Sequence, residues 1–192
     1  KGPVILDGGT GSCLRKMGMP VGVSTEQWVY EHPEEIARLQ REYADAGSMV
    51  IYAPTFGANR ETLKGMGLEA NVEILNRELV KRAYDAGVDT IVTCDNGIAA
   101  VQEIAYAKEL GMTVIVTDHH EVQEELPSAQ VIVNPRQADC PYPFKKLCGA
   151  AVAWKLVGAF WQQMGLPLDD LYDELLMFAG FATVGDVMDL TG

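Results

Sequence analysis

Val114-Ile-Val-Thr-Asp-His-His120 is the stretch from which both the fold and the site of this chain can be inferred. Its first four residues form a short β-branched run, which is typical of a parallel strand buried on both faces. Asp118, His119 and His120 follow at once, so three metal-capable side chains stand where that strand ends. Open α/β sheets bind their ligands at the carboxyl ends of the strands. The stretch therefore predicts a parallel sheet with a polar site at its carboxyl edge.

Two further carboxylates are expected at the same edge of the sheet. Asp95 follows a second apolar run, Thr90 to Cys94, and Asp186 lies downstream in Ala182-Thr-Val-Gly-Asp-Val187. Each residue alone is as readily explained as a helix cap or a turn residue. Carboxylates and imidazoles gathered in one place suit Mn²⁺, so the three segments together predict a metal site.

The rest of the chain alternates between strand and helix patterns. Short runs rich in Val and Ile predict strands at Val4–Asp7, Met49–Ala53, Thr90–Cys94, Val114–Thr117 and Val131–Val133. Helical patterns over 33–46, 71–86 and 99–110 each end at a glycine, and two more helices are expected at 150–164 and 169–181. We expect one three-layer α/β domain over residues 1–192, with a five-stranded parallel sheet in the flavodoxin-like order 2-1-3-4-5 and C-terminal helices beside it. A barrel-like curvature of the first half is the alternative.

Composition narrows the class of protein. With 48% hydrophobic residues the chain can bury a substantial core, and no apolar run is long enough to span a membrane. The net charge of −12 argues against a broad nucleic-acid-binding surface but is compatible with a nucleotide phosphate held at a metal. Four cysteines without CxxC spacing indicate reduced thiols in a cytoplasmic protein: Cys13, Cys94, Cys140 and Cys148.

From about residue 87 onward the chain resembles the DHH phosphoesterase family, in its RecJ-type single-strand exonuclease branch. The matching stretches are Val92–Ile98, Val116–Glu121, Val133–Arg136, Asp139–Phe144, Gly149–Ala153 and Thr183–Val187. The resemblance implies a two-metal site for Mn²⁺ or Mg²⁺ that includes Asp95, Asp118, His119, His120 and Asp186. It also implies a phosphate or nucleotide substrate, with His119 or His120 as the catalytic histidine that binds or polarises the phosphate.

Residues 3–85 resemble a different family, the homocysteine S-methyltransferases. The resemblance rests on Ile5-Leu-Asp-Gly-Gly-Thr-Gly11, on Pro33–Gly47 and on Pro54-Thr-Phe-Gly-Ala-Asn59. It implies the first two strand–helix units of a TIM barrel. None of the four cysteines stands in the Gly-Cys-Cys context that binds zinc in that family.

The DHH part also departs from its family. A DHH enzyme begins with a strand that carries several aspartates, whereas this chain offers Asp7 alone at that place, and it stops at Gly192 before the family's C-terminal domain. The leading interpretation is an engineered chimera of segments 1–86 and 87–192 with a weak residual metal site, to which Asp7 contributes, and little or no activity. One alternative is an active Mn²⁺-dependent phosphodiesterase or single-strand exonuclease. A homocysteine or corrinoid methyl-transfer module is the remaining alternative.

One helical pattern near the end of the chain carries a wide apolar stripe. Its members recur at steps of three and four residues: Trp154, Val157, Phe160, Trp161 and Met164. The stripe is explained either as core against the sheet or as a surface that joins two copies of the chain. We expect a homodimer through this Trp154/Trp161 helix.

Overall fold

The structure is a computed structural model that describes residues 7–48, 50–55, 57–85 and 87–190, without the side chains of residues 170–174. The chain divides into two compact units, Lys1–Val88 and Asp89–Gly192. The division falls close to the boundary expected between segments 1–86 and 87–192. A single domain over residues 1–192, built from segments 1–86 and 87–192, stays a prediction.

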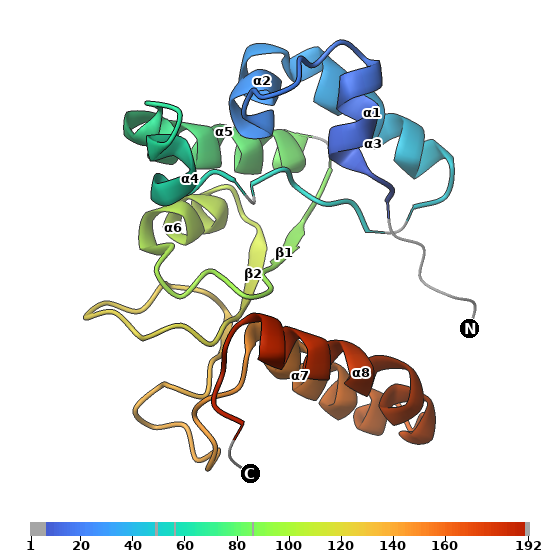
Figure 1. Cartoon of the computed structure of the whole chain (residues 1–192), viewed down its shortest axis with the longest axis vertical. Coiled ribbons are helices and arrows are strands. Elements are labelled where there is room, and N and C mark those ends of the chain that lie inside the picture. Colours follow the sequence, from blue (N-terminus) through green and yellow to red (C-terminus); the bar gives the residue numbers. More distant parts are fainter. Residues whose placement is uncertain (1–6, 49, 56, 86, 191–192) are drawn as a thin grey trace. The chain divides into compact units, whose positions relative to one another are not determined.

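The described part of the first unit is mainly helical. Its elements are α1 (Thr10–Lys16), α2 (Thr25–Glu31), α3 (Pro33–Asp45), α4 (Arg60–Lys64), the 3₁₀ helix η1 (Glu69–Asn71) and α5 (Val72–Asp85) (Figure 1). Pro33 occupies the first turn of α3, where its missing N–H costs nothing, and two glutamates follow it. The side chains buried between the helices are Leu14, Met19, Trp28, Val29, Ile36, Leu39 and Leu79.

A buried carboxylate ties α2 to the loop that follows Thr55. Glu26 is 7% exposed. Its oxygens accept hydrogen bonds from the N–H of Gly57 at 2.7 Å and from the hydroxyl of Ser24 at 2.9 Å. A Cβ on Gly57 would lie 2.7 Å from both oxygens, so a larger residue there would displace the Glu26 carboxylate. A charge can be buried in this way because it is hydrogen-bonded.

The described residues contain three strands and not the five expected, and these three lie in chain order, as do the last three strands of the expected order 2-1-3-4-5. Of the first expected strand, Val4–Asp7, only Asp7 is described, and Met49 of the second lies outside the described residues. Val50 makes an isolated bridge, and the N–H of Tyr52 donates to Asp7 Oδ2 at 2.9 Å instead of to a backbone carbonyl. Pro54 has no N–H, so no ladder continues beyond this point.

The sheet belongs to the second unit. It consists of β1 (Thr90–Val92), β2 (Thr113–Thr117) and β3 (Val131–Val133), which are parallel and lie in the order β1-β2-β3 (Figure 1). Val114 and Val116 of the central strand are fully buried, as expected for a strand covered on both faces. The α/β class with a parallel sheet is therefore confirmed, and all three strands point their carboxyl ends the same way.

Helices flank this sheet. α6 (Val101–Glu109) connects β1 to β2 and ends at Gly111, whose φ of +86° is the left-handed conformation that favours glycine. α7 (Gly149–Gln163) and α8 (Asp169–Gly185) pack against each other as a hairpin. The contact between them includes the buried residues Cys148, Ala151 and Ala179. The hairpin thereby connects the start of α7 with the end of α8.

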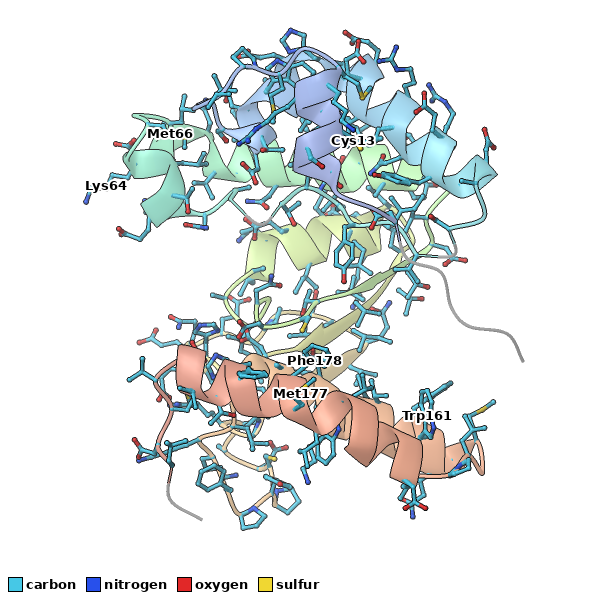
Figure 2. All side chains as sticks on the ribbon, turned by 45° about the vertical axis from the view of Figure 1, so that its right-hand side comes forward. Cys13, Lys64, Met66, Trp161, Met177 and Phe178 are labelled. Carbon is cyan, nitrogen blue, oxygen red and sulfur yellow. The ribbon has the colours of Figure 1, made fainter. Side chains whose placement is uncertain are left out.

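The hairpin also exposes many apolar side chains. They include Phe160 on α7, Met164 directly after it and, on α8, Leu176, Met177, Phe178, Phe181 and Val184. Met177 and Phe178 are labelled in Figure 2. Trp154 and Trp161, the centre of the predicted stripe, are half-buried. No helix within the described ranges combines the length and the apolar character that a membrane crossing requires.

Candidate metal centre

The site starts where β1 and β2 end side by side. The N–H of Asp95 donates to the carbonyl of Thr117 at 3.1 Å, and the N–H of Asp118 donates to the carbonyl of Val133 at 3.1 Å. Asp95 has a φ of +63°, a left-handed conformation that aspartate tolerates better than most residues. The sheet thus fixes the backbone that carries the candidate ligands.

His119 lies between two carboxylates. Its Nε2 is 3.0 Å from Asp95 Oδ1 and 3.3 Å from Asp186 Oδ2. The His119 side chain is 7% exposed, yet neither ring nitrogen has a hydrogen-bond partner among the described residues, because the short contacts do not have hydrogen-bond geometry. A buried polar atom without a partner is costly and calls for an explanation. A divalent cation between imidazole and carboxylates supplies one, so the residues present fit a metal ion.

His120 can add a ligand to the same place. One possible ligand atom from each of Asp95, His119 and His120 lies within 4.8 Å of the others. His120 Nδ1 is 2.7 Å from Asp118 Oδ1. Because a carboxylate only accepts, Nδ1 carries the proton and Nε2 keeps its lone pair. The exposed imidazole of His120 is therefore available to a metal or, once protonated, to a phosphate.

Asp118, at 1% exposure, is the most deeply buried of the predicted ligands. Its carboxylate accepts hydrogen bonds from the backbone N–H groups of Ile98 at 2.8 Å, His119 at 2.7 Å and His120 at 3.1 Å. Burial by itself raises the pKa of Asp118, but the bonds from Ile98 and from both histidines outweigh it, and the pKa lies below its ordinary value. The charged carboxylate of Asp118 thus fixes the backbone of both histidines through hydrogen bonds. Its role as a metal ligand stays a prediction.

Asp186 reaches the site from the C-terminal end of α8. Its N–H donates to the carbonyl of Ala182 at 2.8 Å, and the N–H of Met188 donates to that of Thr183 at 3.0 Å. The residue between them, Val187, has a φ of +54°. A β-branched residue in this conformation is a strained outlier. The strain sits directly beside a candidate ligand.

We expect Val187→Gly to stabilise the protein by about 1 kcal/mol, since glycine adopts a positive φ without the clash of a Cβ. Val187 is exposed, so the substitution removes little packing. Urea unfolding measures the effect. As a matched control, Val184→Gly in the last turn of α8 should lower stability by up to about 1 kcal/mol, because glycine weakens a helix. Equal losses at both positions would show that Val187 is not strained.

Two other residues named from the sequence stand apart. The carboxylate of Asp7 belongs to the first unit, where Oδ2 accepts from Tyr52; its contribution to the metal site stays a prediction. Cys94 precedes Asp95, and burial followed by the nearby charges of Asp95 and Asp118 raises the pKa of its thiol. The thiol therefore stays protonated at neutral pH, which disfavours a thiolate ligand or nucleophile.

Sequence reasoning assigned no role to several groups that shape the site. The amide of Asn134 donates to the carbonyl of His120 at 3.0 Å, and Asn134 is 2% exposed. Its Oδ1 accepts from the N–H of Arg136 at 2.8 Å, and Arg136 pairs with Glu121. Asn134 directly follows β3, so its place at the carboxyl edge of the sheet was the available signal.

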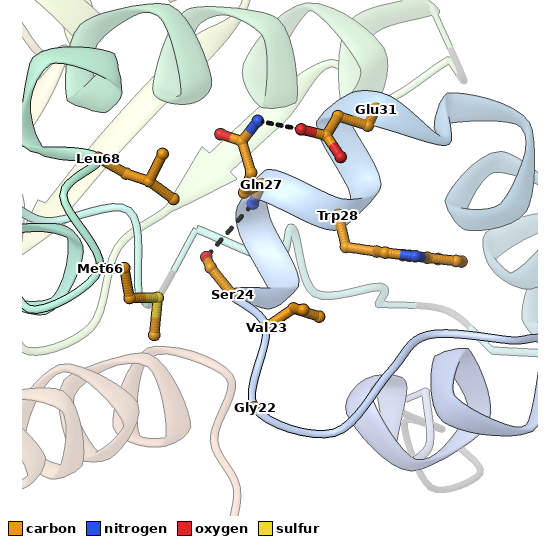
Figure 3. A pocket seen from close by; sticks show the side chains of 8 residues that line it. All are labelled: Gly22, Val23, Ser24, Gln27, Trp28, Glu31, Met66 and Leu68. Atoms are coloured by element: carbon orange, nitrogen blue, oxygen red, sulfur yellow. Dashed lines mark hydrogen bonds between the residues drawn. The ribbon is translucent and has the colours of Figure 1, made fainter.

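A separate hollow of about 210 Å³ lies in the first unit (Figure 3). It is lined by Gly22, Val23, Ser24, Gln27, Trp28, Glu31, Met66 and Leu68. Gln27 donates to Glu31 at 2.5 Å, so the carboxylate is already engaged. Pockets that bury drug-sized ligands span roughly 300–1,000 Å³, and we assign no function to this one.

The spacing of the ligands along the chain has a counterpart in a known family. The sequence profile described as "DHH family, N-terminal domain" matches residues 10–180. The chain belongs to the DHH family. The match covers the segment of Asp95, Asp118, His119 and His120, and it also extends across residues that resemble the methyltransferases.

Two kinds of relative share sequence with this DHH chain. The single-stranded-DNA-specific exonuclease RecJ of Bacillus subtilis is 45% identical over 115 residues, which cover 60% of this chain and 14% of that protein. Betaine–homocysteine S-methyltransferase 1 of Sus scrofa is 35% identical over 83 residues, or 43% of this chain and 30% of that protein. The double resemblance seen in the sequence is therefore confirmed.

A solved structure supports the same relationship. RecJ from Thermus thermophilus, solved in complex with Mn²⁺, aligns with a TM-score of 0.50 and 29% identity over 82% of this chain and 20% of that one. The chain thus spans a minor part of each relative. A divalent metal requirement agrees with this neighbour and with the grouping of Asp95, His119 and His120.

Proposed function

We propose that the chain carries a partial DHH-type metal site that acts on phosphate esters, with activity close to background. The observation that carries the proposal is the buried, unpartnered Nε2 of His119 between the carboxylates of Asp95 and Asp186. The neighbouring RecJ structure is described as a complex with Mn²⁺, and we extend that ion, or Mg²⁺, to this chain.

Each side chain has a role in the proposed site. Asp95, His119 and Asp186 would hold the ion, Asp118 would orient both histidines, and His120 would bind or polarise a phosphate oxygen. Bound divalent ions activate water and stabilise the leaving oxygen of a phosphodiester. The half-exposed carboxylates, 54% for Asp95 and 42% for Asp186, leave the site open to a solvent-borne substrate.

We propose that the site is incomplete because Asp7 alone stands where the family has several aspartates. Missing carboxylates leave coordination positions to water and weaken the affinity for a hard cation. The reaction rate falls more than the metal affinity does, because a displacement of a catalytic group by about 1 Å can lower a rate roughly a hundredfold. An engineered exchange of the first strand–helix units, with a junction near residues 82–88, accounts for both the missing aspartates and the methyltransferase-like segment.

Calorimetric titration with Mn²⁺ tests the binding. We expect weak binding that Asp186→Ala abolishes, since that variant removes one carboxylate beside His119. Asp169→Ala, at the other end of α8, is the matched control and should bind as the parent does. Tight binding of two ions would show that the site is complete, and an unchanged isotherm for Asp186→Ala would place the ion elsewhere.

An assay on a simple phosphodiester, with and without Mn²⁺, separates the partial site from an active enzyme. We expect turnover close to the uncatalysed background. Robust turnover that depends on Mn²⁺ and disappears in Asp186→Ala would favour the second candidate, an active phosphodiesterase or single-strand exonuclease. The RecJ relative of Bacillus subtilis, a single-stranded-DNA-specific exonuclease, motivates this alternative.

We also propose that two copies of the chain associate through the α7–α8 hairpin. Exposed apolar side chains concentrate there, led by Phe181 at 70% and Val184 at 64% exposure. Light scattering over a hundredfold dilution should show a dimer that dissociates, and Phe181→Glu should give a folded monomer. A parent protein that stays monomeric at every concentration would end this proposal.

A further inference from the structure

Gly149, the first residue of α7, lies directly against the side chain of Asp95. A Cβ on Gly149 would be 2.1 Å from Asp95 Oδ1, 2.4 Å from its Cγ and 2.5 Å from its Cβ. Non-bonded carbon atoms prefer separations of about 3.5–4.0 Å. Any residue other than glycine at position 149 therefore occupies the space that the Asp95 carboxylate now fills.

Rotation of the Asp95 side chain cannot relieve this overlap. The contact includes the Cβ of Asp95, whose position is fixed by the backbone and does not depend on χ1. That backbone is held by the hydrogen bond from the N–H of Asp95 to the carbonyl of Thr117, at 3.1 Å. It is held further by the left-handed turn at φ +63°.

The start of α7 has equally little freedom to move away. Cys148 is 1% exposed, and its Sγ accepts from the N–H of Ala151 at 3.4 Å as the helix cap. The same sulfur lies 3.4 Å from the hydroxyl of Thr183 on α8. Ala151 and Val152 are buried. A side chain at position 149 would thus overlap with Asp95 while neither the start of α7 nor the backbone of Asp95 has room to move away.

We propose that Gly149 is a positioning residue of the metal site, because its missing Cβ is the space that lets Asp95 reach His119. Asp95 Oδ1, the atom closest to the added Cβ, is also the atom 3.0 Å from His119 Nε2. Gly149 acts through Asp95 and touches neither metal nor substrate. The proposal rests on the proposed function, to which it adds a determinant of the ligand geometry.

The first test is Gly149→Ala, measured by Mn²⁺ calorimetry and by thermal unfolding without metal. Disturbed supporting contacts lower metal affinity roughly tenfold to a hundredfold, and we expect a loss in that range. Overpacking should also lower the unfolding midpoint by about 5 °C. Gly180→Ala in α8 is the control, since a Cβ there meets nothing within 4 Å. This variant should lower neither the affinity for Mn²⁺ nor the unfolding midpoint.

A double-mutant cycle keeps the test decisive even if Gly149→Ala folds poorly. Asp95→Gly removes the three atoms nearest to the new Cβ, Oδ1, Cγ and Cβ of Asp95, and retains a residue suited to positive φ. In that background Gly149→Ala should leave the unfolding midpoint unchanged, and the double variant should fold. If Gly149→Ala lowers the unfolding midpoint as much in the Asp95→Gly background as in the parent protein, the two substitutions are additive and the proposal is overturned.

The two readouts separate this proposal from the proposed function. If the parent protein binds no Mn²⁺ while the cycle shows coupling between positions 95 and 149, the proposed function fails and only the steric fit of Gly149 against Asp95 stands. If the parent binds Mn²⁺ and the cycle is additive, the metal site stands and the role of Gly149 is refuted.

Discussion

Asp118→Ala should be among the most damaging single substitutions in the second unit, with a loss of about 3–5 kcal/mol in the free energy of unfolding. The carboxylate is 1% exposed and accepts three backbone N–H bonds, besides its contact with His120 Nδ1. Alanine leaves the buried N–H groups of Ile98 and His119 without a partner. A lost interaction with a charged acceptor is more costly than an ordinary hydrogen bond.

The same substitution should abolish Mn²⁺ binding, because Asp118 fixes the turn that carries both histidines. Urea unfolding and calorimetry measure the two effects on one preparation. Asp89→Ala is the matched control: that carboxylate is exposed and accepts from the hydroxyl of Thr90 alone among the described hydrogen bonds. A parent-like isotherm for Asp118→Ala would mean that neither the turn nor its carboxylate supports the metal.

His119→Leu should have opposite effects on metal binding and on stability. Without an imidazole between Asp95 and Asp186, we expect no measurable Mn²⁺ binding, and added Mn²⁺ should no longer raise the unfolding midpoint. In the absence of metal, however, the variant should be about 1–2 kcal/mol more stable than the parent. Leucine removes two buried nitrogens that lack hydrogen-bond partners in the described structure.

His32→Leu is the control for this prediction. His32 Nδ1 lies 2.9 Å from the carbonyl of Trp28, and its ring stacks on the indole with centroids 4.5 Å apart. Because the contacts of His32 are satisfied, its replacement by leucine should lower the free energy of unfolding of the protein. A loss of stability at both positions would show that the environment of His119 is satisfied without a metal.

Local patterns in the sequence predicted much of the second unit. The β-branched runs at 90–94, 114–117 and 131–133 became β1, β2 and β3, and the glycine after residue 110 ended α6. Such features depend on neighbours in the chain. The convergence of Asp95 and His119 followed from the same reasoning, because the ends of adjacent parallel strands meet at one edge.

Other features depended on contacts that the sequence does not display. In the expected strand at 49–53 the structure describes only an isolated bridge at Val50, and the N–H of Tyr52 donates to the carboxylate of Asp7, a partner 45 residues away. Asp118 accepts a hydrogen bond from the N–H of Ile98, which is 20 residues away in the chain. The sequence pattern indicated a metal ligand at this position and gave no sign of this structural hydrogen bond. The fit of Gly149 against Asp95 requires the packing of α7 against the sheet, which no local pattern encodes.

An anomalous difference map from crystals soaked in Mn²⁺, collected at the manganese edge, locates the ion among the proposed ligands. We predict one partly occupied peak within bonding distance of Asp95, His119 and Asp186, and no second peak of equal height beside it. Two fully occupied peaks would contradict the claim that the site is partial. A map without any peak near His119 Nε2 would contradict the metal site itself.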